Sequence, residues 1–157
     1  MIATAARTLY ETVASPVGDL LLTSDGERLT GLIFAEPPTR DMVRDRAALK
    51  EPVQQLRAYL AGELKDFDFE IEQPGTDFQK RVWAELMAIP YGETISYAEL
   101  ARRIGQPKAP RAVGSANGRN RIAIVVPCHR VIAADGTPGG YGGKLWRKEW
   151  LLNRERG

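Results

Sequence analysis

The stretch Ser96–Gly118, SYAELARRIGQPKAPRAVGSANG, predicts two short helices joined by a turn. Ser96 followed three residues later by Glu99 is typical of a capping box at the start of a helix. Gly105 is typical of the position just past a helix end, and Pro110 suits the first turn of a second helix. Two short helices joined by a glycine-containing turn indicate a helix-turn-helix, although many helical hairpins share this pattern.

Basic side chains are concentrated in and around this stretch. The chain of 157 residues has a net charge of +2, but residues 1–75 contain 8 Lys and Arg against 13 Asp and Glu, whereas residues 76–157 contain 14 against 7. Between Glu99 and Asp135 there are seven Lys and Arg and no acidic residue. This asymmetry indicates that the second half binds a polyanion, and a solvated basic face is the alternative interpretation.

The first half has the pattern of a small sheet domain. Turn signals separate its apolar runs, and Asp25-Gly26 between two of these runs predicts a hairpin. Gln73-Pro74-Gly75 breaks the pattern, so we expect domains at residues 1–75 and 76–157. The expected elements are strands at Leu9–Val13, Leu20–Thr23 and Leu29–Phe34, a helix that begins at Pro52 and ends before Gly62, and a half-buried strand over Phe67–Ile71.

The second half is predicted to be mainly helical. Thr76 and Gln79 have the spacing of another capping box, and a final helix is expected to begin near Lys144. Helical spacing places Glu155 on the apolar face of that last helix, where a carboxylate needs a partner. We therefore expect an α/β fold, in which a small N-terminal domain of sheet and helix precedes a helical C-terminal domain with a (winged) helix-turn-helix and an active-site loop.

The composition excludes several classes of protein. No apolar run approaches the ~20 residues that a membrane-spanning helix needs, and the N-terminal segment lacks the long apolar stretch of a secretory signal. One cysteine cannot form an internal disulfide, and together with one histidine it cannot build a structural zinc site. We expect a reduced protein of the cytoplasm, or alternatively of the nucleus, without metal, cofactor or membrane association.

The only cysteine and the only histidine of the chain, Cys128 and His129, are neighbours in an apolar segment. If residues 122–126 form a strand, the two side chains point to opposite faces, so they cooperate only if the backbone turns at Pro127 or if a water bridges them. A thiol reacts as a thiolate, which a basic or cationic neighbour favours. A structural role is the alternative, since free cysteine is commonly a small buried hydrophobe.

Three features favour chemistry over structure at this pair. Pro127 imposes an irregular backbone, Arg130 follows the pair directly, and Glu155 is available to orient the imidazole of His129. A nucleophile, a base and a group that aims the base form a generalised catalytic triad.

Five motifs in this half resemble those of the O6-alkylguanine-DNA alkyltransferases, a family of direct-reversal DNA repair proteins. They are YGETISY at residues 91–97, RAVG at 111–114, NGRN at 117–120, PCHRV at 127–131 and GYGG at 140–143, in the order and spacing of the family. The resemblance covers residues 76–157, and the N-terminal half matches only in its general layout.

The resemblance implies a reaction and a role for each matching residue. Cys128 would accept the alkyl group of O6-alkylguanine, or of O4-alkylthymine, irreversibly and once per molecule. His129 would take the thiol proton through a water, and Glu155 would orient His129. Asn120 would brace the active-site turn, and Tyr97 would give a proton or a hydrogen bond to a guanine ring nitrogen. The implied DNA contacts are Tyr97, Ala98, Gln106 and Arg111, with Arg111 as the finger that enters the base stack, and the implied pocket residues are Val131 through its carbonyl, Tyr141 and Gly142 on the active-site loop.

Some of these positions depart from the family or have plainer interpretations. Arg121 stands where many relatives have proline, Gly142 stands where some have serine, and the zinc ligands near the N-terminus of some members are absent. The plainer interpretations are that Tyr97 packs against Leu100, Arg111 contacts a phosphate, Asn120 holds a turn and Glu155 is solvated near the end of the chain.

The expected partner is double-stranded DNA that contains O6-alkylguanine, bound by a monomeric protein. A rival function is that of an alkyltransferase-like lesion sensor, which binds damaged guanine without repairing it, but members of that group lack the cysteine. A transcription regulator that uses the helix-turn-helix and a cysteine hydrolase are more remote alternatives.

Overall fold

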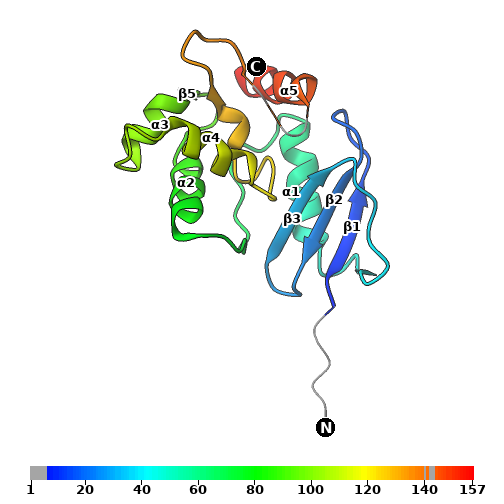
Figure 1. Cartoon of the computed structure of the whole chain (residues 1–157). Coiled ribbons are helices and arrows are strands. Elements are labelled where there is room, and N and C mark those ends of the chain that lie inside the picture. Colours follow the sequence, from blue (N-terminus) through cyan, green and yellow to red (C-terminus); the bar gives the residue numbers. More distant parts are fainter. Residues whose placement is uncertain (1–6, 140, 142–143) are drawn as a thin grey trace. The chain divides into compact units, whose positions relative to one another are not determined.

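The computed structural model describes residues 7–139, 141 and 144–157 (Figure 1). The chain divides into two compact units, Met1–Gln73 and Pro74–Gly157. In the described ranges, no helix has both the length and the apolar character needed to cross a bilayer.

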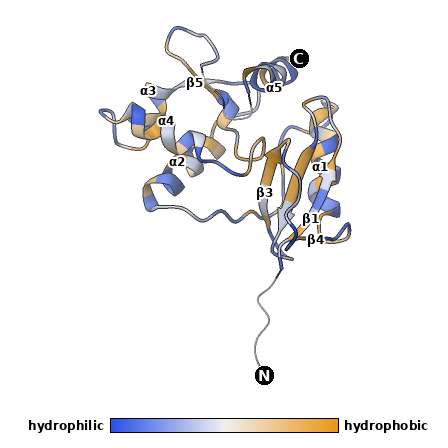
Figure 2. Ribbon diagram, turned by 45° about the vertical axis from the view of Figure 1, so that its right-hand side comes forward, coloured by the Kyte–Doolittle hydropathy of each residue, from blue (hydrophilic) through white to orange (hydrophobic). Residues whose placement is uncertain are grey.

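The first unit is built on a four-stranded sheet with the strand order β3-β2-β1-β4. Strand β4 is parallel to β1, and the other neighbours are antiparallel. All five residues of β2 are buried, and hydrophobic residues run along the strands (Figure 2). The elements of this unit are β1 (Leu9–Val13), β2 (Leu20–Ser24), β3 (Leu29–Phe34), β4 (Val43–Arg44) and the helix α1 (Lys50–Leu60).

Most of the predicted elements of this unit are confirmed. The three strands match, and Asp25-Gly26 forms the hairpin turn, in which Asp25 Oδ1 accepts from the backbone N–H groups of Glu27 and Arg28 at 2.9 and 2.8 Å. Helix α1 begins at Lys50, two residues before the expected Pro52.

The strand predicted over Phe67–Ile71 is wrong. Only Ile71 pairs with the sheet, through a single bridge to Leu29. The Phe67 ring lies 5.4 Å from the ring of Tyr59 and 5.7 Å from that of Phe69. The alternating pattern therefore reflects aromatic rings packed in a cluster, without the continued backbone pairing that makes a strand.

The second unit is mainly helical. Its helices α2, α3 and α4 contact one another, and the buried side chains among them include Val82, Leu86, Leu100 and Val113. A two-stranded parallel sheet joins β5 to β6, with Ile95 opposite Val131. The elements of this unit are α2 (Asp77–Met87), β5 (Ile95–Ser96), α3 (Tyr97–Arg103), α4 (Pro110–Gly118), the 3₁₀ turn η1 (Cys128–Arg130), β6 (Val131–Ile132) and α5 (Leu145–Arg156).

The helix starts show why the sequence folds in this way. The capping box before α2 is confirmed, because Thr76 Oγ1 accepts from the Gln79 backbone N–H and Gln79 Oε1 accepts from the Thr76 backbone N–H. At α3 only half of the expected box forms. Ser96 Oγ accepts from the Glu99 backbone N–H at 3.0 Å, whereas the Glu99 carboxylate pairs with Arg102 and Arg103 instead of turning back to the cap.

Gly105 makes the predicted helix-turn-helix possible. Its φ of 77° lies in the left-handed region that favours glycine, and the N–H groups of Gly105 and Gln106 donate to the carbonyls of Arg102 and Ala101 at 3.0 and 2.9 Å. These two bonds close α3 in the pattern of a Schellman motif, and Pro110 then opens α4 as expected.

Candidate active site

Cys128 follows a buried segment that is not a strand. Residues 122–126 turn instead, with the Val126 N–H donating to the Ile122 carbonyl at 3.0 Å. Ile124 has a φ of 72°, a rare and strained conformation for a β-branched residue. The conditional expectation of an extended segment is therefore wrong, and the nucleophile candidate opens the 3₁₀ turn η1.

Asn120 stabilises this irregular segment through its side-chain amide. Its Oδ1 accepts from the Ile122 N–H at 3.0 Å, and its Nδ2 donates to the Val126 carbonyl at 2.8 Å. The same Nδ2 lies 3.3 Å from Cys128 Sγ. Asn120 thus replaces missing backbone partners of this segment and also places a donor on the thiol.

The groups around Cys128 have opposing effects on the pKa of its thiol. Burial raises the pKa of the thiol, while hydrogen bonds from Asn120 and Tyr141 and the positive charge of Lys148 lower it. Burial dominates, so the resting group is a protonated thiol that needs a base to become a nucleophile.

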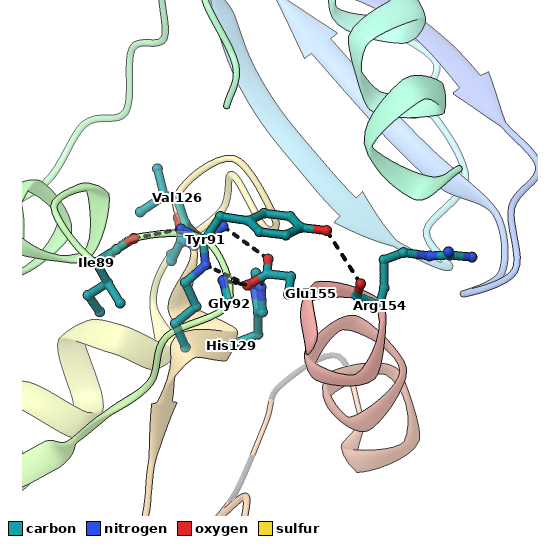
Figure 3. Close-up of polar contacts among 9 residues, drawn as sticks. Ile89, Tyr91, Gly92, Val126, His129, Arg154 and Glu155 are labelled. Atoms are coloured by element: carbon teal, nitrogen blue, oxygen red, sulfur yellow. Dashed lines mark hydrogen bonds and ion pairs between the residues drawn. The ribbon is translucent and has the colours of Figure 1, made fainter. Parts of the chain in front are cut away.

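His129 is fully buried, and one of its nitrogens is held by Glu155. The distance from His129 Nε2 to Glu155 Oε2 is 2.7 Å (Figure 3). Burial lowers the pKa of His129, and the charges of Arg130 and Lys148 act in the same direction against the raising effect of Glu155. A neutral imidazole that donates from Nε2 keeps its base lone pair on Nδ1, which has no hydrogen-bond partner within the described ranges.

The carboxylate of Glu155 also neutralises Arg130. Arg130 Nε lies 2.8 Å from Glu155 Oε1 and its Nη2 lies 3.0 Å from Oε2, while its Nη1 donates to the Ile89 carbonyl at 2.7 Å. Arg130 and Glu155 are both buried, and each is 7% exposed when backbone and side chain are taken together. The expected burial of Glu155 is confirmed, and the sequence reasoning missed that Arg130 is its second partner.

The Tyr91-Gly92 pair fixes the end of helix α5, which carries Glu155. The Gly92 N–H donates to Glu155 Oε1 at 3.3 Å, and the Tyr91 hydroxyl donates to the Arg154 carbonyl at 3.4 Å (Figure 3). Both residues belong to the YGETISY motif, which could have indicated that they are part of the site, but no role was predicted for either of them.

Tyr97 reaches the same region because β5 pairs with β6. It follows β5 directly, while Val131 in β6 follows the turn that carries Cys128. A Cβ atom built on Gly114 or on Gly139 would lie 3.8 or 3.5 Å from the Tyr97 ring, so the ring lies against both glycines. Burial raises the pKa of Tyr97, and the proximity of Cys128 raises it further.

Val131 and Tyr141 lie near Tyr97, and the buried Lys148 contacts all three residues. Lys148 Nζ donates to the Val131 carbonyl at 2.6 Å and lies 5.9 Å from the ring centroids of both Tyr97 and Tyr141. Lys148 was missed by the sequence reasoning. The third predicted pocket residue, Gly142, lies outside the described residues.

The predicted DNA contacts lie on an exposed surface of the helix-turn-helix. Ala98 on α3, Gln106 in the turn and Arg111 in the first turn of α4 are all exposed. The nearby Arg102 is exposed as well, but it pairs with Glu99. Tyr97 at the start of α3 is partly buried, and the thiol of Cys128 is buried in the same unit.

The described residues contain no group of three or more His, Cys, Asp or Glu side chains that could hold a metal ion. The side chains that do converge are a thiol, an imidazole, a carboxylate, two phenols and an ammonium group. Such a set suits nucleophilic chemistry with proton transfer.

Comparisons with known proteins agree with this arrangement. The profile of the 6-O-methylguanine DNA methyltransferase DNA binding domain matches residues 77–157, and that of the ribonuclease-like domain matches residues 8–73. The methylated-DNA–protein-cysteine methyltransferase of Mycobacterium tuberculosis is 52% identical over 151 residues, which cover 94% of this chain and 92% of the relative. The protein of the same name from Methanosarcina acetivorans is 48% identical and covers 93% and 97%.

A solved structure gives the same result in three dimensions. The crystal structure of Mycobacterium tuberculosis OGT in complex with DNA superposes with a TM-score of 0.89 at 53% identity, over 94% of this chain and 92% of that chain. The chain therefore belongs to the 6-O-methylguanine DNA methyltransferase family.

Proposed function

We propose that this protein repairs double-stranded DNA by moving the alkyl group of O6-alkylguanine, and of O4-alkylthymine, onto Cys128, once per molecule. The observation that carries the proposal is the polar chain at the nucleophile. A thiol touched by Asn120 is followed by a neutral histidine whose Nε2 is held by Glu155 at 2.7 Å.

The proposed reaction begins with the thiol proton. His129 takes this proton on Nδ1 through a water, and the Glu155 carboxylate stabilises the imidazolium that forms. The thiolate then attacks the alkyl carbon, so that an S–C bond forms while the C–O bond breaks and its electron pair stays on the guanine. Tyr97 donates a hydrogen bond or a proton to a guanine ring nitrogen, which makes guanine a better leaving group.

The product explains why each molecule acts once. A thioether has no protonatable leaving group, so the same site cannot hydrolyse the S–C bond once it has formed. The reaction is therefore stoichiometric, and the protein is consumed with the lesion.

Docking on DNA is assigned to the exposed helix-turn-helix surface. The target base must leave the stack to reach the buried thiol. We assign Arg111 to the gap left in the stack, and Ala98 and Gln106 to the DNA backbone. Val131 through its carbonyl, Tyr141 and Gly142 would line the pocket. Residues 76–157 would form the DNA-binding and catalytic domain, and residues 1–75 would support it. The protein would act as a monomer in the cytoplasm, where the thiol stays reduced.

The test compares the wild-type protein with a Cys128→Ser variant on duplex DNA that carries O6-methylguanine. The variant is expected to bind the lesion but not react, because an alkoxide is far harder to form than a thiolate at neutral pH. The wild type is expected to leave unmodified guanine in the DNA. Binding without loss of the methyl group from the DNA by the wild type would select the lesion sensor and refute the proposal.

A further inference from the structure

Lys148 is a fully buried lysine that the mechanism above does not use. It projects from α5, and its exposed fraction is 0%. Its ammonium group donates to the Val131 carbonyl at 2.6 Å and faces the rings of Tyr97 and Tyr141, each 5.9 Å away. The lysine thus lies against two residues assigned to the alkyl-guanine pocket, Val131 and Tyr141, and against Tyr97, which is assigned the proton donation.

Burial of an ammonium group is costly, so its place in this pocket calls for an explanation. Burial lowers the pKa of Lys148 to about 8, and an ionised Cys128 opposes this effect. A methionine of similar volume would fill the space without a charge, and apolar replacements of buried charges are often neutral or stabilising. Packing alone therefore does not account for a lysine at this position.

The charges around the pocket suggest what the lysine does. Arg130 is neutralised by Glu155, and His129 is uncharged in the resting protein. The charge of Lys148 lowers the pKa of both Cys128 and His129, the first effect favouring the thiolate and the second keeping the imidazole able to accept a proton. Tyr97 and Tyr141 face the ammonium through their ring faces, which attract a cation.

We propose, on the basis of the proposed function, that Lys148 is a positioning residue of the alkyl transfer, whose ammonium group holds the Val131 carbonyl at the pocket wall and stabilises the Cys128 thiolate. The carbonyl has two lone pairs, so it can accept from Lys148 and from the exocyclic amine of guanine together. The charge acts on the reaction through the thiolate and through this carbonyl.

The first experiment measures the thiol without DNA. Cys128 is the only cysteine, so the rate of its reaction with iodoacetamide between about pH 6 and pH 10 reports its pKa in the intact protein. Lys148→Met is expected to raise this pKa by about one unit or more and to slow the reaction near pH 7 by about ten-fold. Lys148→Arg is expected to restore most of the rate, because it keeps a positive charge.

Two controls separate this role from a structural one. Lys144→Met removes an exposed positive charge just before α5 and is expected to leave the thiol pKa unchanged. Thermal unfolding shows whether Lys148→Met is folded, and Lys148→Gln carries the same test if it is not. An unchanged thiol pKa in the folded variant would overturn the electrostatic part of the proposal.

The carbonyl is tested with a base that lacks the exocyclic amine. The wild type is expected to repair O6-methylguanine faster than O6-methylhypoxanthine in duplex DNA, and Lys148→Met is expected to lose most of this preference. An unchanged preference would overturn the positioning part. A wild-type protein that reacts with iodoacetamide but repairs neither base would refute the proposed function instead, so the two failures are distinguishable.

Discussion

Replacement of Glu155 by glutamine should lower the free energy of unfolding more than a comparable substitution at the surface would. In the wild type the carboxylate accepts from His129 at 2.7 Å, from Arg130 at 2.8 and 3.0 Å, and from the Gly92 N–H at 3.3 Å. Glutamine keeps the shape of the side chain but removes the charge. It would leave the Arg130 guanidinium buried without a counter-ion.

The expected loss follows from the burial of both partners. The side chains of Arg130 and Glu155 are only 8% and 2% exposed, so solvent cannot replace the lost charge. Removing one partner of a buried ion pair typically costs about 3–5 kcal/mol. Glutamine retains some hydrogen bonds, so we expect a loss of about 3 kcal/mol from a total stability of about 5–15 kcal/mol.

The assay is urea denaturation of the wild type, Glu155→Gln and a matched control, Glu99→Gln. Glu99 also pairs with two arginines, Arg102 and Arg103, but these pairs face solvent and are screened. The midpoint should fall for Glu155→Gln with an unchanged slope and should hardly move for Glu99→Gln. If both variants shift equally little, the buried pair does not hold the end of α5, and the reasoning is refuted.

Three further outcomes follow from the same geometry. Burial lowers the pKa of His129 in the folded protein, so on acidification the unfolded chain binds a proton near about pH 6.5 while the folded His129 stays neutral. The free energy of unfolding should therefore fall as the pH drops below that value. Because His129→Asn cannot bind this proton, the urea midpoints of the wild type and the variant should converge at these lower pH values. Arg111→Ala should slow repair in duplex DNA by about ten-fold or more while sparing reaction with free O6-benzylguanine, since the flipped base leaves a gap only in a duplex; equal losses would place Arg111 in the chemistry. The alkylated protein should melt several degrees lower than the unmodified one. Cys128 is only 6% exposed, so an added methyl group would overpack its surroundings at a cost of about 1–3 kcal/mol and would weaken the hydrogen bond from Asn120. A raised or unchanged melting temperature would show a roomier pocket.

Local rules were sufficient where the chain follows them. The caps at Thr76 and Ser96 and the left-handed Gly105 are short-range signals, so the helix-turn-helix could be predicted from residues within a few positions of one another. The burial of Glu155 followed from helical spacing alone.

Long-range contacts account for what was missed. Arg130 directly follows Cys128 and His129 in the sequence, but its partners are the Ile89 carbonyl and Glu155, far along the chain in both directions. Helical spacing places Lys148 two turns before Glu155 on the same buried face, but lysine is ordinarily a surface residue, so its burial was not predicted.

Backbone irregularity is the second reason. The segment 122–126 has the apolar character of a strand, but the Asn120 side chain satisfies its backbone groups and permits a turn. Similarly, Phe67–Ile71 has the alternation of a strand, yet its backbone meets the sheet only at the bridge of Ile71 to Leu29, where the Leu29 N–H donates to the Glu70 carbonyl at 3.0 Å. Periodicity reports which side chains are buried, and it does not report where the backbone hydrogen bonds go.

The most direct test of the account is a count of methyl groups on the protein. The protein would be incubated with an excess of duplex DNA carrying O6-methylguanine, and its intact mass and its peptides would be measured over time. The account predicts a plateau at one methyl group per molecule, on Cys128, with one lesion repaired for each protein molecule. Repair that continues beyond one lesion per molecule, or a methyl group on any residue other than Cys128, would contradict it.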